Sequence, residues 1–173
     1  VVMADKLDKG TTIAFVADVS SSALEIWAQL TDSDGSISEA DGYAAHVLTR
    51  HEGQCRNLHG HTYRVIVEVA EAEDGRDMVI DFKDLKQVIR EVILDRFDHA
   101  FIYNEASESE CEIAAVIAKH GMKSAGLPFR STAENLARHF YDALAAHVNV
   151  VAVRVFETPE SCAEYRRDAG VRP

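Results

Sequence analysis

Two histidines on either side of a glycine, His59-Gly60-His61, give the sequence its strongest chemical signal. The run that follows, residues 62–69, is rich in β-branched and aromatic residues and therefore predicts a strand. On a strand the side chains of residues i and i+2 point to the same face, so the two imidazoles project together, with Cα atoms about 6–7 Å apart. Both rings can then reach one metal ion at about 2 Å each. Two strand histidines that only hydrogen-bond to their neighbours are the alternative interpretation.

A third imidazole would complete the ligand set of a catalytic zinc ion, which keeps one coordination position open. His46 ends the segment before the histidine pair, and antiparallel pairing of the two segments would bring it beside His59 and His61. His51 is the rival ligand, but it belongs to a polar loop whose position strand pairing does not fix. We therefore predict a Zn²⁺ site formed by His46, His59 and His61.

The thiol of Cys55, four residues before His59, has two interpretations. As a fourth ligand it would close the coordination sphere and make the zinc structural, which describes a non-catalytic zinc-binding module whose folding depends on metal. As a free thiol beside a metal ion it would have a lowered pKa and could move protons as a thiolate. The spacing alone does not choose between these roles.

Two further acidic groups could take part in chemistry. Asp98 precedes His99 at the end of a predicted helix, where a carboxylate that orients an imidazole forms a proton relay. The alternative is that the histidine only favours the negative pole of the helix. Glu157 follows a valine-rich strand, and its carboxylate could accept two parallel N–H bonds from the guanidine-like edge of a 2-amino-4-oxopteridine. An exposed turn glutamate is the alternative there.

The elements that must position these groups follow from hydrophobic periodicity. Strands are predicted over residues 11–18, 62–72, 149–156 and 161–167, and residues 23–30 form either a strand or a short helix. An amphipathic helix follows the N-cap Asp81 and ends at Asp98, and shorter helices follow capping boxes that begin at Ser109 and Ser131. The layout is α+β, an antiparallel sheet with two main helices on one face.

Composition limits the function classes. A chain of 173 residues fits one domain, and its net charge of −11 argues against nucleic acid and anionic membranes as partners. No apolar stretch is long enough to span a bilayer. The three cysteines are an odd set in a chain that does not need disulfides, which predicts a reducing, cytoplasmic location.

Taken together and in this order, the motifs resemble the 6-pyruvoyltetrahydropterin synthase superfamily. The likeness runs from about Tyr43 to Tyr165. It is carried by Ala44-Ala45-His46, Cys55-x-x-x-His59-Gly60-His61, Val79 to Lys86, Asp98-His99, Ser131 to Asn135, and Glu157-Thr158. Residues 1–35 have no counterpart in it, so we predict an N-terminal extension over 1–35 and a single catalytic domain over 36–173.

The resemblance implies a tunnelling fold, in which a four-stranded antiparallel sheet and two main helices assemble as trimers that stack into homohexamers. It implies a small-molecule pterin substrate and zinc on the three histidines. It assigns the other site residues as follows: proton transfer by Cys55, Asp98 and His99, the pterin anchor at Glu157, and a contact to the pterin ring from Thr132.

The three residues between Cys55 and His59 resemble the bacterial 6-carboxytetrahydropterin synthases of the queuosine (7-deazaguanine) pathway. The implied reaction converts 7,8-dihydroneopterin triphosphate to 6-carboxy-5,6,7,8-tetrahydropterin, with loss of acetaldehyde and triphosphate. The pyruvoyl-forming synthases, which share the zinc, the substrate and the fold, are the alternative, and Ser131 is a feature of their type. Candidate residues for binding the triphosphate are Lys83, Arg64 and Arg130.

Overall fold

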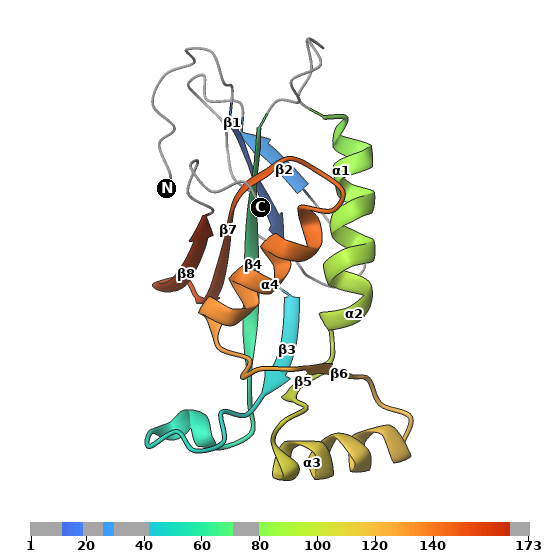
Figure 1. Ribbon diagram of the computed structural model, residues 1–173, viewed down its shortest axis with the longest axis vertical. Coiled ribbons are helices and arrows are strands. Elements are labelled where there is room, and N and C mark those ends of the chain that lie inside the picture. The colour runs from blue at the N-terminus through green and yellow to red at the C-terminus, as the bar shows by residue number, and fades with distance from the viewer. Residues whose placement is uncertain (1–11, 19–25, 30–41, 71–79, 167–173) are drawn as a thin grey trace.

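One long strand, β4 (His59–Ala70), organises the sheet. The computed structural model describes residues 12–18, 26–29, 42–70 and 80–166. Within these ranges β4 pairs antiparallel with three other strands, namely β1 (Thr12–Asp18), β3 (Gly42–His46) and β7 (Val150–Thr158). The strand therefore has a pairing partner along its whole length (Figure 1). Its pairing with β3 fixes the histidines at its start.

The described residues form one sheet of eight strands, which corrects the expectation of four antiparallel strands. The remaining strands are β2 (Ile26–Gln29), β5 (Phe101–Asn104), β6 (Ser124–Leu127) and β8 (Ser161–Arg166). β5 runs parallel to both β3 and β6, so the sheet is mixed. The parallel pair arises because β5 and β6 are joined through the helix α3 (Glu108–Lys119), the kind of crossover that parallel neighbours require.

Two main helical segments cover one face of the sheet, as predicted (Figure 1). The first is α1 (Phe82–Ile89), continued by a π-helical stretch (Arg90–Leu94) and α2 (Asp95–Phe97); the second is α4 (Ala133–Leu144). The carboxylate of Asp81 caps α1 by accepting a hydrogen bond from the Lys83 amide at 2.7 Å. The core packs between these helices and the sheet, and its members include Leu85, Ile89, Leu136, Phe140, Leu144, Val153 and Val155.

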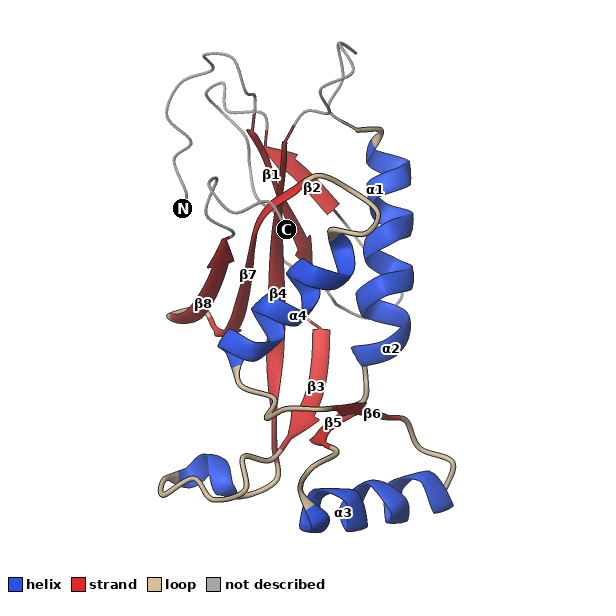
Figure 2. Cartoon of the chain, in the orientation of Figure 1, coloured by secondary structure: helices blue, strands red, loops and turns tan. Residues whose placement is uncertain are grey.

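Residues of β4 alternate between the two faces of the sheet. The odd-numbered residues face the helices, and four of them are buried in the core, namely Tyr63, Val65, Val67 and Val69. His59 and His61 share this parity, so their rings lie on the helix-covered side. On the opposite face, α3 packs in a second, smaller cluster with Val47 and Phe101. In Figure 2, α3 lies near β5 at the lower end of the molecule, away from α1 and α4.

The N-terminal part of the chain contributes to the same sheet. The strand predicted over residues 11–18 is β1, and the ambiguous stretch 23–30 contains the strand β2. β1 pairs along β4 from Thr12 to Asp18. The rest of the predicted extension lies outside the described residues, so the boundary at residue 35 stays a prediction. Among the described helices, none has the length and apolar content needed to cross a membrane.

Candidate functional site

Three imidazoles meet where β3 ends and β4 begins. In the antiparallel register His46 lies opposite His59, and Ala44 lies opposite His61, so the three rings share one face. The ring centroids are 4.5, 4.9 and 5.1 Å apart. One nitrogen from each ring lies within 4.8 Å of the other two, an arrangement that could hold a metal ion.

Hydrogen bonds fix which nitrogen is free in two of the rings, His46 and His59. Nδ1 of His46 donates to the Ser131 carbonyl at 2.9 Å, and Nδ1 of His59 donates to the Asn57 carbonyl at 2.7 Å. The His61 ring hydrogen-bonds to the backbone of Glu157. A ring that donates through Nδ1 keeps a lone pair on Nε2, and such backbone partners orient metal-ligating histidines. The Nε2 atoms of His46 and His59 are 3.0 Å apart, close to the roughly 3.3 Å expected for two tetrahedral zinc ligands.

Burial disfavours the charged form of two of these rings, His46 and His61. The side chain of His46 is 1% exposed, and burial lowers its pKa to about 4. Burial also lowers the pKa of His61, with a further contribution from the neighbouring His59. Neutral imidazoles are the form that binds metal, so these residues fit a zinc ion chemically as well as geometrically.

Gly60, between the two histidines, allows close approach of the strands. A Cβ atom built at this position would lie 3.2 Å from the Ala44 carbonyl oxygen on β3. A larger residue would therefore have to push apart the two strands that carry the imidazoles.

A tyrosine and a carboxylate adjoin the imidazoles. The Tyr63 hydroxyl is 3.4 Å from Nδ1 of His46, and burial together with the charges of Glu157 and Cys55 raises the pKa of Tyr63. Glu157 lies in β7 one residue after Phe156, the partner of Arg64 on β4. Burial raises the pKa of Glu157, and the nearby Glu134 raises it further. Glu157 is thus a half-buried carboxylate at the edge of the three-imidazole group.

Cys55 lies on a short 3₁₀ turn, Gln54–Arg56, in the loop that joins β3 to β4. The Leu48 amide donates to the Cys55 carbonyl at 2.9 Å, which closes this loop. Within the described chain, the group of mutually close metal-ligand atoms contains the three imidazoles and not the Cys55 sulfur. His51 also lies outside this group, because its exposed ring accepts a hydrogen bond from the Gly53 amide instead.

Asp98 and His99 follow α2, and the chain turns sharply there because His99 has a φ of 56°. Nδ1 of His99 is 2.9 Å from a carboxylate oxygen of Asp98. The His99 ring meets the Tyr43 ring edge-on at 5.9 Å and lines an open pocket of about 740 Å³. That pocket also includes Ala45 and Phe101, which alternate with His46 and Ile102 along their strands. His61 borders the same pocket, but Gly60, Thr62 and Phe101 in its lining belong to the sheet face opposite the imidazoles, and the His99 ring is turned toward that face.

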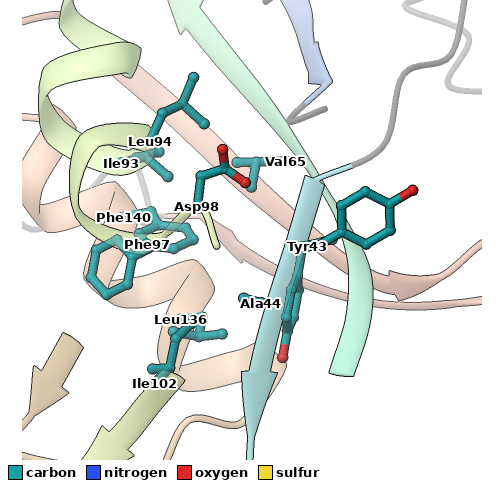
Figure 3. A pocket seen from close by; sticks show the side chains of 11 residues that line it. Tyr43, Ala44, Val65, Ile93, Leu94, Phe97, Asp98, Ile102, Leu136 and Phe140 are labelled. Atoms are coloured by element: carbon teal, nitrogen blue, oxygen red, sulfur yellow. The ribbon is translucent and has the colours of Figure 1, made fainter. Parts of the chain in front are cut away.

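Asp98 itself points back toward the helix-covered side. Its carboxylate borders a small apolar cavity of about 30 Å³, where it lies beside Leu94 and Val65 (Figure 3). In the described structure its Oδ1 atom has the His99 contact but no hydrogen bond of good geometry.

The start of α4 supplies contacts that sequence reasoning missed. The capping box was expected to begin at Ser131, but Thr132 is the N-cap and accepts from the Asn135 amide at 3.4 Å. Ser131 is fully buried, and both its carbonyl and its hydroxyl, at 3.1 Å, contact Nδ1 of His46. Thr132 is thereby held next to the imidazole group, but its own hydroxyl accepts the N-cap hydrogen bond of α4.

Arg130 precedes this turn and carries an unusual guanidinium. Its Nε and Nη2 atoms are buried and have no hydrogen-bond partner among the described residues. These two atoms form the edge that binds carboxylate or phosphate in a bidentate manner. Neither Lys83 nor Arg64, the other predicted triphosphate contacts, shows such buried and unpaired donor atoms.

The family profile of 6-pyruvoyl tetrahydropterin synthase matches residues 38–168, and the chain belongs to this family of enzymes. A 6-carboxy-5,6,7,8-tetrahydropterin synthase of Haemophilus influenzae is 44% identical over 128 residues, which cover 70% of this chain and 91% of that protein. A synthase of the same name from Aquifex aeolicus is 37% identical over 128 residues, 66% of this chain and 77% of that protein.

Solved structures show the same fold. An uncharacterized protein from Wolinella succinogenes superposes with a TM-score of 0.67 at 20% identity and covers 93% of this chain and 100% of its own. The 6-pyruvoyl tetrahydropterin synthase of Caenorhabditis elegans gives a TM-score of 0.57 at 21% identity, covering 92% of this chain and 96% of its own.

Proposed function

We propose that this chain is a zinc-dependent lyase that converts 7,8-dihydroneopterin triphosphate and one water molecule to 6-carboxy-5,6,7,8-tetrahydropterin, acetaldehyde and triphosphate, a reaction of queuosine (7-deazaguanine) biosynthesis. The observation that carries the proposal is the group of three imidazoles, each with one ligand nitrogen within 4.8 Å of the other two, beside the half-buried Glu157. The names of the Haemophilus and Aquifex relatives support the same product.

His46 and His59 would hold the zinc ion through their Nε2 atoms, and His61 through one nitrogen of its ring. When bound, zinc supplies Lewis acidity toward the side-chain hydroxyls of the substrate. The residues of the chain do the rest. Glu157 accepts two N–H bonds from the pterin edge. Thr132, held beside His46 through Ser131, contacts the pterin ring. This places the dihydroxypropyl side chain of the substrate toward the imidazoles.

Proton transfer is assigned to Cys55, Asp98 and His99. Cys55, as a thiolate, removes a proton from the substrate side chain. Asp98 orients His99, which exchanges protons with a different face of the same side chain. Since the His99 ring is turned toward the far face of its own sheet, we propose that a second copy of the chain presents its His99 to the imidazoles. This supports a homo-oligomer, and a trimer, or a hexamer made of two stacked trimers, closes such a head-to-tail contact.

The triphosphate would bind to Arg130, whose two buried donor atoms have no partner among the described residues. A buried guanidinium without an acceptor is costly, and an incoming phosphate oxygen pair removes that cost. The odd number of cysteines, with all three unpaired, fits the proposed reducing cytoplasm.

The direct test is incubation of the zinc-loaded protein with 7,8-dihydroneopterin triphosphate, followed by mass analysis of the pterin product. A 6-carboxy product together with acetaldehyde supports the proposal. A 6-pyruvoyl product would establish the second candidate, which Ser131 at the start of α4 and the description of the matching family profile favour. No turnover, combined with a cysteine–zinc signature in the X-ray absorption spectrum, would instead support a structural zinc-binding module.

A further inference from the structure

The carboxylate of Glu110 is fully buried in α3 and has no part in the reaction proposed above. One oxygen accepts a hydrogen bond from the Thr49 hydroxyl at 2.5 Å, and the other accepts from the Asn104 amide at 2.7 Å. In the described structure no cation pairs with it. A buried carboxylate is costly unless hydrogen bonds satisfy it, so these two contacts account for how it is tolerated.

The position of Glu110 in α3 makes its contacts unexpected. It is the third residue of the helix, where a glutamate commonly reaches back to the amide of the N-cap residue. Here the carboxylate instead turns away from the N-cap amide. It bonds to Asn104 at the end of β5 and to Thr49 on another segment of the chain. The first turn of a helix also favours a negative charge electrostatically. Glu110 therefore uses a favourable site to tie α3 to a loop 61 residues away in sequence.

That loop is the connection from β3 to β4, with His46 at its start, His59 at its end and Cys55 within it. Several hydrogen bonds within the loop fold it, and two of them involve the backbone of Leu48. The Leu48 amide donates to the Cys55 carbonyl at 2.9 Å, and the His51 amide donates to the Leu48 carbonyl at 3.0 Å. Thr49 follows Leu48 in the chain, and the Leu48 amide holds the Cys55 carbonyl. The hydrogen bond from Thr49 to Glu110 therefore fixes the part of the loop to which the Cys55 backbone is bonded.

We propose that Glu110 is a positioning residue for Cys55, acting through Thr49. The inference rests on the proposed function, because it assumes that the Cys55 thiol moves protons at the zinc site. It also gives a role to α3, which lies on the sheet face opposite the imidazoles: the helix braces the loop that carries the thiol. Without the brace the loop opens, the thiol loses its alignment with the substrate, and the three imidazoles, fixed by strand pairing, stay in place.

The test compares matched pairs of variants. Thr49→Val removes the hydroxyl but keeps the side-chain shape, whereas Thr49→Ser keeps the hydroxyl. Glu110→Ala removes both acceptors, whereas Glu110→Gln can accept from Asn104 through its oxygen and donate to Thr49 through its amide. Glu112→Ala, on an exposed position of the same helix, is the control.

Two readouts separate positioning from general stability. For Thr49→Val and Glu110→Ala we expect kcat to fall by about tenfold or more, with KM and zinc content close to wild type, since an alignment loss of this size is common for displaced catalytic groups. We expect iodoacetamide to alkylate Cys55 several-fold faster, measured by peptide mass mapping that resolves Cys55 from Cys111 and Cys162. Thr49→Ser, Glu110→Gln and Glu112→Ala should match the wild type in both readouts.

The proposal is overturned if Thr49→Val leaves the Cys55 alkylation rate equal to that of Thr49→Ser, whatever happens to kcat. If Glu110→Ala does not fold, as judged by circular dichroism, the Thr49 pair decides. If the wild-type protein does not turn over the pterin at all, the proposed function fails, while the alkylation rates still show whether Glu110 holds the loop.

Discussion

His46 and His59 face each other across two paired strands with their Nε2 atoms 3.0 Å apart, and each ring donates its Nδ1 proton to a backbone carbonyl. Two neutral nitrogens at this separation direct their lone pairs into the same space. A cation between them turns that repulsion into coordination, which is why we expect the group to bind zinc tightly and through three nitrogens.

Removal of one ligand should remove the metal. His61→Ala is expected to reduce zinc from about one ion per chain to near zero, since two imidazoles do not hold a catalytic zinc ion. Elemental analysis of the purified protein measures this directly. His51→Ala, an exposed position outside the group, should keep full occupancy. Full zinc content in His61→Ala would exclude His61 as a ligand.

The metal-free protein should lose stability in acid because of His46. Its pKa falls from 6.5 to about 4 on burial, so the folded state binds fewer protons than the unfolded chain between these values. The contribution is fully present above pH 6.5 and is lost as the pH falls toward 4, by up to about 3 kcal/mol. Burial of His61 acts in the same direction.

Urea unfolding of the chelated protein at a series of pH values between 7.5 and 4.5 measures this effect. The variant His46→Gln should show a shallower decrease in the free energy of unfolding than the wild type. Equal slopes for the two proteins would show that His46 does not carry the pH dependence.

The pterin anchor can be tested by binding alone. Glu157→Ala should weaken the binding of a pterin without a triphosphate by about 2–5 kcal/mol, because it breaks a partly buried charged contact. Fluorescence titration or calorimetry measures the affinity. Glu160→Ala, an exposed acidic change three residues away, is the control. Unchanged affinity in Glu157→Ala would remove this residue as the anchor.

Cys55 and His99 should complement each other between copies of the chain. Cys55→Ala and His99→Ala are each expected to keep zinc and pterin binding but to lose turnover. If one site takes Cys55 from one copy and His99 from another, a refolded equimolar mixture regains about a quarter of wild-type activity, because a quarter of random neighbours supply both residues. No recovery in mixed oligomers would mean that both groups act within one chain.

Arg130 should affect only the phosphorylated substrate. Arg130→Gln is expected to raise KM by about tenfold or more, since each lost hydrogen bond to a charged group is worth about 1.5–3 kcal/mol. Its affinity for the pterin without triphosphate should match the wild type. Arg138→Gln, an exposed arginine on α4, serves as the control. Equal KM values for both variants would argue against a triphosphate contact at Arg130.

The alternation of β4 and its pairing with β3 could be predicted from sequence, and with them the meeting of three imidazoles on one face. The strands β5 and β6 could not, because four-residue strands on either side of a helix leave too little periodic signal. The contact between Ser131 and His46 could not be predicted, because the two residues are 85 positions apart in the sequence. The face occupied by His99 depends on a positive φ at a non-glycine residue, which no residue pattern indicated.

The backbone partners of the three imidazoles come from the β3–β4 loop, the turn before α4 and the end of β7. These segments are distant in sequence, so the acceptors that orient the three rings come together only when the sheet and α4 have formed, whereas the rings themselves meet through the pairing of β3 with β4. The tertiary structure therefore completes the orientation of ligands that a local strand pair has already gathered.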